Sequence, residues 1–223
     1  MPNLAKYTTP MIAADVVLFT VKDGQLNVLL IKMKKHPFEK MWAAPGGMIK
    51  GNESPDDAAH RLLVDKTGVD NVYLEQLFTF GDVKRDPFGR VISIGYMALV
   101  PSEHLVLATN SDYDGVAWFP VNKLPPLAYD HTDMIALAID RLKSKLGYTN
   151  IAKALLPDKF PFSRLQHVYE SILGKALDKR NFTTRMIALS LVIKTREFEK
   201  HVAYRPAQLY RFKSAKMMYV DIV

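Results

Sequence analysis

Residues 47–69 restrict the fold of this chain more than any other segment, because they join a glycine turn to a tightly spaced helical run. Glu53 follows Gly47 after five residues, and seven more residues lead to Arg61-Leu62-Leu63-Val64-Asp65-Lys66-Thr67-Gly68-Val69. Helix positions three or four apart share a face, so side chains at this spacing can act together on one ligand. The pattern predicts an amphipathic helix that begins after a glycine turn.

This spacing resembles the Nudix box, in which clustered glutamates on one helix hold magnesium against a diphosphate. Glu53 and Arg61 match the family's pattern, but Leu62, Asp65 and Lys66 stand where the family has glutamates. Leucine offers no oxygen ligand, and lysine places a cation where magnesium would sit. The resemblance therefore implies a Nudix scaffold with no working catalytic residues, no metal and no required cofactor. We expect hydrolysis to be absent, or to survive only as weak pyrophosphatase activity.

The surroundings of residues 47–69 argue against the alternative of an isolated amphipathic helix without this ancestry. The preceding run Trp42-Ala43-Ala44-Pro45-Gly46-Gly47 is similar to the Trp-x-x-Pro-Gly-Gly run of Nudix proteins. Further upstream, residues 14–21 and 26–33 have the pattern of two strands joined by the turn signal Asp23-Gly24. A strand hairpin followed by the box helix favours the Nudix fold.

Composition limits the class of protein without naming a function. A chain of 223 residues can form one large domain or two modest ones. No apolar run reaches the roughly 18 to 20 residues that a membrane span requires, and residues 1–9 do not have the pattern of a secretory signal. The absence of cysteine excludes disulfides, thiolate metal sites and cysteine nucleophiles. We expect a cytoplasmic protein with no membrane partner.

The basic charge of the chain is confined to its last third. Residues 151–223 hold 14 Lys and Arg against 6 Asp and Glu, a net charge of +8, whereas residues 1–150 hold 16 basic and 17 acidic residues, a net charge of −1. A near-neutral region joined to a strongly basic one indicates that the second region meets a polyanion. A solvated basic face is the alternative that charge alone leaves open.

The first region, residues 1–150, alternates strand and helix patterns. Strands are expected over residues 72–80, 90–100 and 116–119, a proline-marked loop over 121–126 and a helix over 130–146. Residues 147–159 contain Gly, Asn and Pro and are the expected linker. The fold class is α+β: the Nudix resemblance implies an α/β/α sandwich, which we expect to be followed by a smaller domain over residues 151–223.

The second region has the element order of a winged helix-turn-helix. Ser163 is an expected N-cap of a helix that ends at Gly174, and Asp178 an expected N-cap of a second helix over residues 179–191. Two strands, residues 192–195 and 208–213, are joined by a basic loop over 196–206. A small helical domain that only supports dimerisation is the alternative.

In a winged helix the second helix enters the major groove of DNA, where its side chains reach bases or phosphates. The residues that this geometry selects are Lys179, Arg180, Asn181, Thr184 and Arg185. The hairpin wing would bring further cations to the backbone or minor groove, namely Arg196, Lys200, His201 and Arg205. Double-stranded DNA is therefore the expected partner.

Together these regions resemble the Nudix-related transcriptional regulators of bacterial NAD metabolism. Five stretches in the same order carry the resemblance: His36-Pro37-Phe38, Arg85-Asp86-Pro87-Phe88-Gly89-Arg90, Leu127-Ala128-Tyr129-Asp130-His131, Leu165-Gln166-His167-Val168 and Arg205-Pro206-Ala207-Gln208-Leu209-Tyr210. The resemblance implies a homodimeric repressor of a palindromic operator that senses ADP-ribose or a related nucleotide sugar. Regulators of sugar catabolism share this architecture, and Phe88 departs from the basic residue often seen in the ADP-ribose type. A Nudix hydrolase with a basic appendage, or a silent module that docks an acidic protein or RNA, are the other readings.

A diphosphate effector needs planar cationic donors, which Arg85 and Arg90 supply from one loop. Asp86 would orient one of these guanidinium groups or bind a ribose hydroxyl. Phe80 or Trp42 would stack on an adenine, although a place in the core suits both rings equally well. His60 and His131 are expected to be structural.

Overall fold

The computed structural model describes residues 8–70, 72–102, 113–200, 203, 205–220 and 222. The chain divides into two compact units. The first consists of Met1–Phe19, Val28–Ala98 and Val106–Ala138, and the second of Thr20–Asn27, Leu99–Leu105 and Ile139–Val223. Helix α2 (His131–Tyr148) therefore begins in the first unit and ends in the second. None of the described helices is both long and apolar enough to cross a bilayer.

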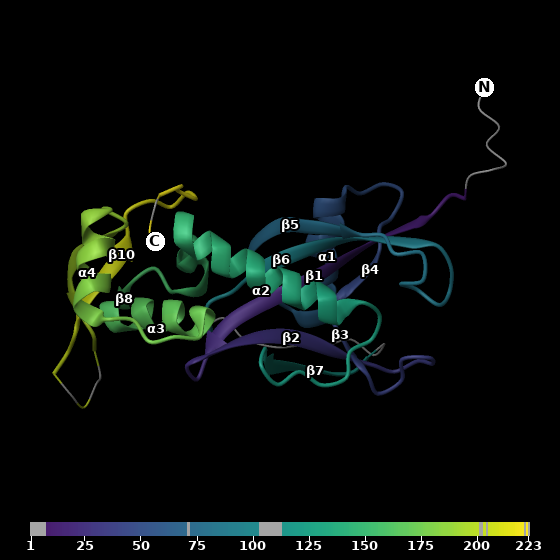
Figure 1. Cartoon of the computed structure of the whole chain (residues 1–223), viewed down its shortest axis with the longest axis horizontal. Coiled ribbons are helices and arrows are strands. Elements are labelled where there is room, and N and C mark those ends of the chain that lie inside the picture. The colour runs from purple at the N-terminus through teal and green to yellow at the C-terminus, as the bar shows by residue number, and fades with distance from the viewer. Residues whose placement is uncertain are drawn as a thin grey trace, which may run out of the picture. The chain divides into compact units, whose positions relative to one another are not determined.

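A seven-stranded sheet forms the centre of the N-terminal region (Figure 1). Its order is β3-β2-β1-β6-β5, with β4 paired to β1 and β7 to β2. The strands are β1 (Met11–Lys22), β2 (Gln25–Met33), β3 (Trp42–Ala43), β4 (Gly46–Met48), β5 (Tyr73–Phe80), β6 (Val91–Leu99) and β7 (Tyr113–Pro120). The predicted β1–β2 turn is confirmed: Asp23 and Gly24 both have positive φ, 51° and 72°, as a two-residue hairpin of this kind requires.

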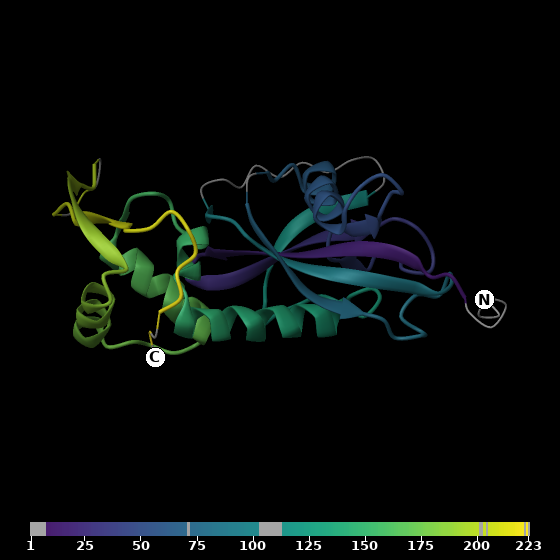
Figure 2. The same ribbon diagram turned by 90° about the horizontal axis from the view of Figure 1, so that it is seen from above.

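Helices cover both faces of this sheet. Figure 2 shows α1 (Pro55–Thr67, blue) on one face and the first turns of α2 (teal) on the other. This layering explains why the middle of β1, residues 13–20, is buried on both sides and is almost entirely apolar. The α/β/α sandwich expected from the Nudix resemblance is present.

Helix α1 has strong local start and stop signals. The Ser54 side chain accepts a hydrogen bond from the Asp57 N–H, and the Asp57 carboxylate accepts one from the Ser54 N–H, which forms a capping box. Gly68 ends the helix with φ 72°. The buried face includes Leu62 and Leu63. The helix predicted from residues 47–69 is thus confirmed, and Leu62 belongs to its core side.

The C-terminal region has the order of a winged helix (Figure 1). After the 3-10 helix η3 (Ile151–Leu155), its elements are β8 (Phe160–Pro161), α3 (Phe162–Leu173), α4 (Lys179–Ala188), β9 (Val192–Phe198) and β10 (Gln208–Phe212). The three strands form a small sheet in the order β8-β10-β9. As predicted, Asp178 caps α4, because its carboxylate accepts the Asn181 N–H at 2.8 Å.

Three local predictions for this region were wrong. The N-cap of α3 is Pro161 rather than Ser163, which lies in the first turn. Helix α4 ends at Ala188, since Ser190 turns the chain with φ 53° before Leu191. Strand β9 continues to Phe198, so Arg196 lies on the strand and not in the loop. Helix and strand patterns are weak at the ends of elements, and for β9 the pairing of Phe198 with Gln208 of β10 extends the strand.

The expected linker over residues 147–159 is also wrong, because this segment is packed. Thr149 and Asn150 are buried, and η3 places Ile151, Ala152 and Leu155 in the core. The C-terminal tail (residues 216–220 and 222) runs beside it: the N–H groups of Val220 and Ile222 donate to the carbonyls of Tyr148 and Gly147, each at 2.8 Å. Gly and Asn favour a loop locally, but hydrogen bonds from the C-terminal tail hold residues 147–150 in one conformation. The domain bounds 1–150 and 151–223 stay a prediction.

Candidate functional site

The two box residues that match the Nudix pattern hold the turn before α1. The Arg61 Nε donates to Glu53 Oε2 at 2.8 Å, and Arg61 Nη2 donates to the Met48 carbonyl at 3.3 Å. Glu53 Oε1 also accepts the Lys50 N–H at 2.7 Å. The hydrogen bonds from Arg61 and from that N–H lower the pKa of Glu53 from 4.5 to about 2. Glu53 is thus a carboxylate bound by its own loop.

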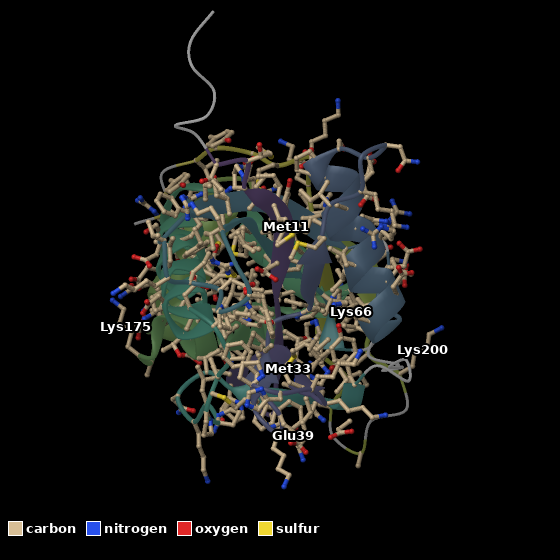
Figure 3. The ribbon with its side chains drawn as sticks, turned by 90° about the vertical axis from the view of Figure 1, so that its right-hand side faces the viewer. Met11, Met33, Glu39, Lys66, Lys175 and Lys200 are labelled. Carbon is tan, nitrogen blue, oxygen red and sulfur yellow. The ribbon has the colours of Figure 1, made fainter. Side chains whose placement is uncertain are left out.

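The substituted box positions face the glycine turn. Leu62 is 5% exposed and packs so closely on Gly47 that a Cβ there would lie 2.9 Å from its Cδ2. Figure 3 shows the Lys66 side chain near the end of α1. Its ammonium donates hydrogen bonds to the Gly46 carbonyl in β4 and to the Tyr113 hydroxyl in β7. It also lies 4.8 Å from the centroid of the Tyr113 ring. A methyl group and a bound ammonium therefore occupy the places of two carboxylates.

These residues do not fit a magnesium ion. Magnesium prefers oxygen ligands, and Leu62 and Lys66 offer none. Within the described part of the chain, no three His, Asp or Glu side chains are grouped so that they would hold a metal. Asp65 lies 3.8 Å from the Arg61 guanidinium, and its side chain is 57% exposed.

A buried network of charged groups lies under the glycine turn. Arg85 donates to both oxygens of Asp130, from Nε at 2.9 Å and from Nη2 at 2.7 Å, and its side chain is 3% exposed. The same Nη2 lies 3.5 Å from Asp15 Oδ2, which also accepts the Ser93 hydroxyl at 2.5 Å. Buried charges of this kind persist only when they are paired and hydrogen-bonded.

His131 completes this network from the first residue of α2. Its Nδ1 accepts the Ala44 N–H at 3.0 Å, so the ring proton is on Nε2, which lies 3.7 Å from Asp15 Oδ2. Burial raises the pKa of Asp15, but His131, Ser93 and Arg85 outweigh it and hold that pKa below its usual value. Asp15 is therefore a buried, ionised carboxylate. Its Oδ1 lies so close to Gly46 that a Cβ there would be 1.7 Å away.

The network forms one wall of a cavity of about 200 Å³. Lys66, Tyr113 and Tyr129 contribute other walls. A wider groove of about 840 Å³, lined by rings such as Phe78 and Phe80, shares Arg85 and Tyr129 with the cavity. The site is therefore a small cavity that continues into a wider groove, and both are lined by apolar and charged residues, including Lys84 and Asp133 in the groove. This shape suits an elongated ligand with a polar part. The further cavity residues include Ala13, Ile31, Met33, Gly47, Met48, Asp86 and Val91.

The predicted ligand residues fall at different places. Arg85 and Asp86 line the cavity, and Phe80 lines the groove. Arg90 instead holds its own loop, because its Nη1 donates to the carbonyls of Gly81 and Asp82 at 2.9 and 3.0 Å. Trp42 packs edge-to-face on Phe119, with ring centroids 4.6 Å apart.

Among the polar side chains that line the cavity, sequence reasoning missed Asp15, Tyr113 and Tyr129, and it assigned His131 a structural role alone. His131 has the structural role expected of it, as the acceptor of the Ala44 N–H, but it also lines the cavity. The one available signal was an aspartate at position 15 within an apolar strand. Such a residue is expensive to bury without partners and so points to a site.

The residues predicted to meet DNA lie on the exposed side of α4. Lys179, Arg180, Asn181, Thr184 and Arg185 are all exposed, whereas Met186 is fully buried. Arg185 differs from the others because its Nε donates to the Ile222 carbonyl of the C-terminal tail at 3.2 Å. On the wing, Arg196, Lys200 and Arg205 are exposed, and His201 lies outside the described residues.

Comparison with known proteins assigns the N-terminal and C-terminal regions to two different family models. Residues 9–138 match the family model of the NUDIX domain, and residues 152–212 match that of the NrtR DNA-binding winged helix domain. The chain is 38% identical over 212 residues to the "ADPR responsive transcriptional repressor NtrR" of Acinetobacter baylyi, an alignment that covers 92% of this chain and 83% of that protein.

Two solved structures from Shewanella oneidensis are similar to different lengths of the chain. NrtR complexed with a 27mer DNA is 36% identical with a TM-score of 0.79, over 91% of this chain and 93% of that one. The NUDIX domain of NrtR complexed with ADP ribose is 35% identical with a TM-score of 0.56, over 62% of this chain and 92% of that one. The chain therefore belongs to the Nudix family, among the members that carry an NrtR DNA-binding winged helix domain.

Proposed function

We propose that the chain is a transcriptional repressor that binds an operator through its winged helix and releases it when ADP-ribose, or a related nucleotide sugar, binds the Nudix cavity. The A. baylyi relative is described as an ADPR responsive repressor, and the S. oneidensis structures contain DNA or ADP ribose. One observation carries the proposal. The same chain combines a Nudix cavity, in which Leu62 and Lys66 replace metal ligands on α1, with the exposed basic and polar helix α4.

Helix α4 is the proposed recognition helix. Arginine binds guanine and asparagine binds adenine through paired hydrogen bonds in the major groove, and Arg180 and Asn181 are exposed in the first turn of α4. Lys179, Thr184 and Arg185, with Arg196, Lys200 and Arg205 on the wing, would contact phosphates or neighbouring bases. A homodimer would present two such helices to a palindromic operator with half-sites about one DNA turn apart.

The cavity and the groove of the Nudix site suit the two parts of a nucleotide sugar. An adenine would stack in the groove beside Phe80, and the diphosphate would lie towards the cavity near Arg85, with Asp86 binding a ribose hydroxyl. Arg85 shares its guanidinium with Asp130 and Asp15, so it shapes the site as well as lining it. Arg90 and Trp42 would act indirectly, by holding the loop and the sheet edge that border the site.

Hydrolysis is proposed to be absent or very slow. A Nudix hydrolase uses its metal to polarise the diphosphate and to generate a nucleophile from water, and Leu62 and Lys66 remove the ligands for that metal. The effector would then persist as a signal instead of being consumed. Incubation of the protein with ADP-ribose and Mg²⁺, followed by chromatography, measures this directly. Turnover of about 1 per second or faster would contradict the sensor role.

The regulatory proposal is tested with an operator selected from a random duplex pool. Fluorescence anisotropy of the selected duplex is followed while ADP-ribose, NAD or simple sugars are added, and the mass of the complex is measured to count protomers. We expect two protomers per palindrome and release by ADP-ribose, since a ligand shifts DNA affinity only if it binds one state of the protein better. Release by a sugar alone would assign a different effector, and tight binding that no ligand changes would reject the sensor.

A further inference from the structure

We propose that Lys66 is a tethered cation that replaces magnesium as the counter-charge for the effector's diphosphate, so that effector binding needs no metal. This inference rests on the proposed function. The Nudix box of this chain has a lysine where the family has a carboxylate ligand for magnesium. Lys66 occupies a metal-ligand position of the box and lines the cavity.

The ammonium of Lys66 is held in place by groups from separate segments. The Gly46 carbonyl from β4 and the Tyr113 hydroxyl from β7 accept its hydrogen bonds, and the Tyr113 ring lies 4.8 Å away. The side chain runs past Gly47, where a Cβ would lie 3.6 Å from Nζ. The Gly46 carbonyl and the Tyr113 hydroxyl are neutral groups that orient a cation. The positive charge therefore has a defined location on the cavity wall.

The other charged groups of the cavity are bound to one another or to the backbone. Arg85 is shared between Asp130 and Asp15, and Asp15 is further bound by Ser93 and His131. Asp86 Oδ1 accepts the Phe88 N–H at 2.8 Å. A diphosphate that enters a site with these carboxylates needs a cation facing it, and the Lys66 ammonium is the cation located where a Nudix box holds its ion.

Lysine also explains binding without reaction. An ammonium supplies a point charge and hydrogen-bond donors to phosphate oxygens, but it has no coordination site at which a water molecule becomes a nucleophile. Leu62, packed on Gly47, removes an oxygen ligand beside it. A magnesium ion would be repelled from the same position. The substitution thus favours tight, metal-independent binding of an intact diphosphate.

Isothermal titration of ADP-ribose tests this, with wild type, Lys66→Met, Lys66→Arg and Lys66→Glu each measured in EDTA and in MgCl2. Wild type should bind equally well in both buffers. Lys66→Met should lose about tenfold to a hundredfold in affinity, the usual effect of removing a hydrogen bond to a charged group. Lys66→Arg should retain most of the affinity, and Lys66→Glu should bind better in MgCl2 than in EDTA.

Lys50→Met is the matched control, because it removes one exposed lysine that precedes the same helix. Circular dichroism and thermal unfolding of every variant identify any that fail to fold, and the Lys66→Arg and Lys66→Glu results do not depend on Lys66→Met being folded. Loss of wild-type binding in EDTA, or wild-type affinity in folded Lys66→Met, would overturn the inference while leaving the proposed effector intact. No ADP-ribose binding by the wild-type protein in either buffer would overturn both.

Discussion

The Nudix cavity and the proposed recognition helix α4 both carry charged side chains, but those charges are buried and paired in the cavity and exposed on the helix. In the cavity, the Arg85 side chain is 3% exposed and is bound by two carboxylates of the protein itself. On α4, Lys179 and Arg180 are exposed to solvent. A buried charge must be stabilised whether or not a ligand is present, whereas an exposed one is already solvated. Cavity charges should therefore matter for folding, and the exposed charges of Lys179 and Arg180 for DNA binding.

The largest effect is expected from Arg85→Met. It leaves Asp15 and Asp130 without their shared cation, so the free energy of unfolding should fall by about 3–5 kcal/mol, as for other broken buried pairs. Urea denaturation measures this. Arg90→Met is the control from the same loop, because Arg90 donates to the carbonyls of Gly81 and Asp82 and pairs with no carboxylate among the described residues, so it should cost less than about 1 kcal/mol. Equal losses in the two variants would show that the buried ion pairs of Arg85 add no stability beyond that of a loop hydrogen bond.

Gly46→Ala tests how closely the buried carboxylate is held. The new Cβ would lie 1.7 Å from Asp15 Oδ1, so the carboxylate or the turn must move, at a cost of about 1–3 kcal/mol in the free energy of unfolding. Gly51→Ala is the matched control five residues later, where no atom lies within 4 Å and the change should stay within about 0.5 kcal/mol. If urea denaturation shows both variants to be as stable as wild type, the Asp15 network is looser than its geometry indicates.

Arg180→Ala should separate binding from folding on α4. Affinity for the selected operator should fall by about tenfold or more if Arg180 reads a base, and the salt dependence should decrease by about one unit of slope if it contacts a phosphate. The free energy of unfolding should change by less than about 0.5 kcal/mol. Lys143→Ala removes one exposed charge from α2 as a control. Equal affinities of the two variants, measured by anisotropy, would reject α4 as the recognition helix.

The smallest effect is expected from Glu53→Gln and appears only as a pH dependence. The pKa of Glu53 falls from 4.5 to about 2 in the folded protein. Its stabilising contribution is therefore complete above about pH 4.5 and is lost as the pH falls towards 2. Unfolding free energies of wild type and Glu53→Gln should differ at neutral pH and converge in that acid range, with exposed Glu39→Gln as the control. A constant difference down to pH 2 would contradict the Glu53–Arg61 pairing.

The features that the sequence predicts well are those set by neighbouring residues. The Asp23-Gly24 turn, the Asp178 cap and the exposed residues of α4 follow from signals within a few residues, because turns, caps and helix periodicity are local. Their prediction needs no knowledge of what lies elsewhere in the chain. The box helix is in the same class, with its capping residues directly before it.

The side-chain pairs of the cavity could not be predicted from local signals, because they join residues that are far apart in the sequence. Arg85 meets Asp130 across 45 residues, and Ser93 meets Asp15 across 78. Strand order and helix packing decide these pairs, and neither is visible in local periodicity. The sequence indicates Arg85 and Arg90 as ligand-binding residues, but it does not reveal that Arg85 binds carboxylates of the protein or that Arg90 binds backbone carbonyls. The packed segment at residues 147–150 was missed for the same reason.

That packed segment has a consequence for cutting the chain into parts. A fragment that begins at residue 151 would include the whole match to the winged helix domain, yet it would delete the carbonyls of Gly147 and Tyr148 that accept the N–H groups of Ile222 and Val220. The tail would then lose its anchor, and Arg185 would lose a fixed acceptor, since its Nε donates to the Ile222 carbonyl. A truncated DNA-binding fragment would thus carry Arg185 of α4 without this acceptor, and expression of this half should begin upstream of α2.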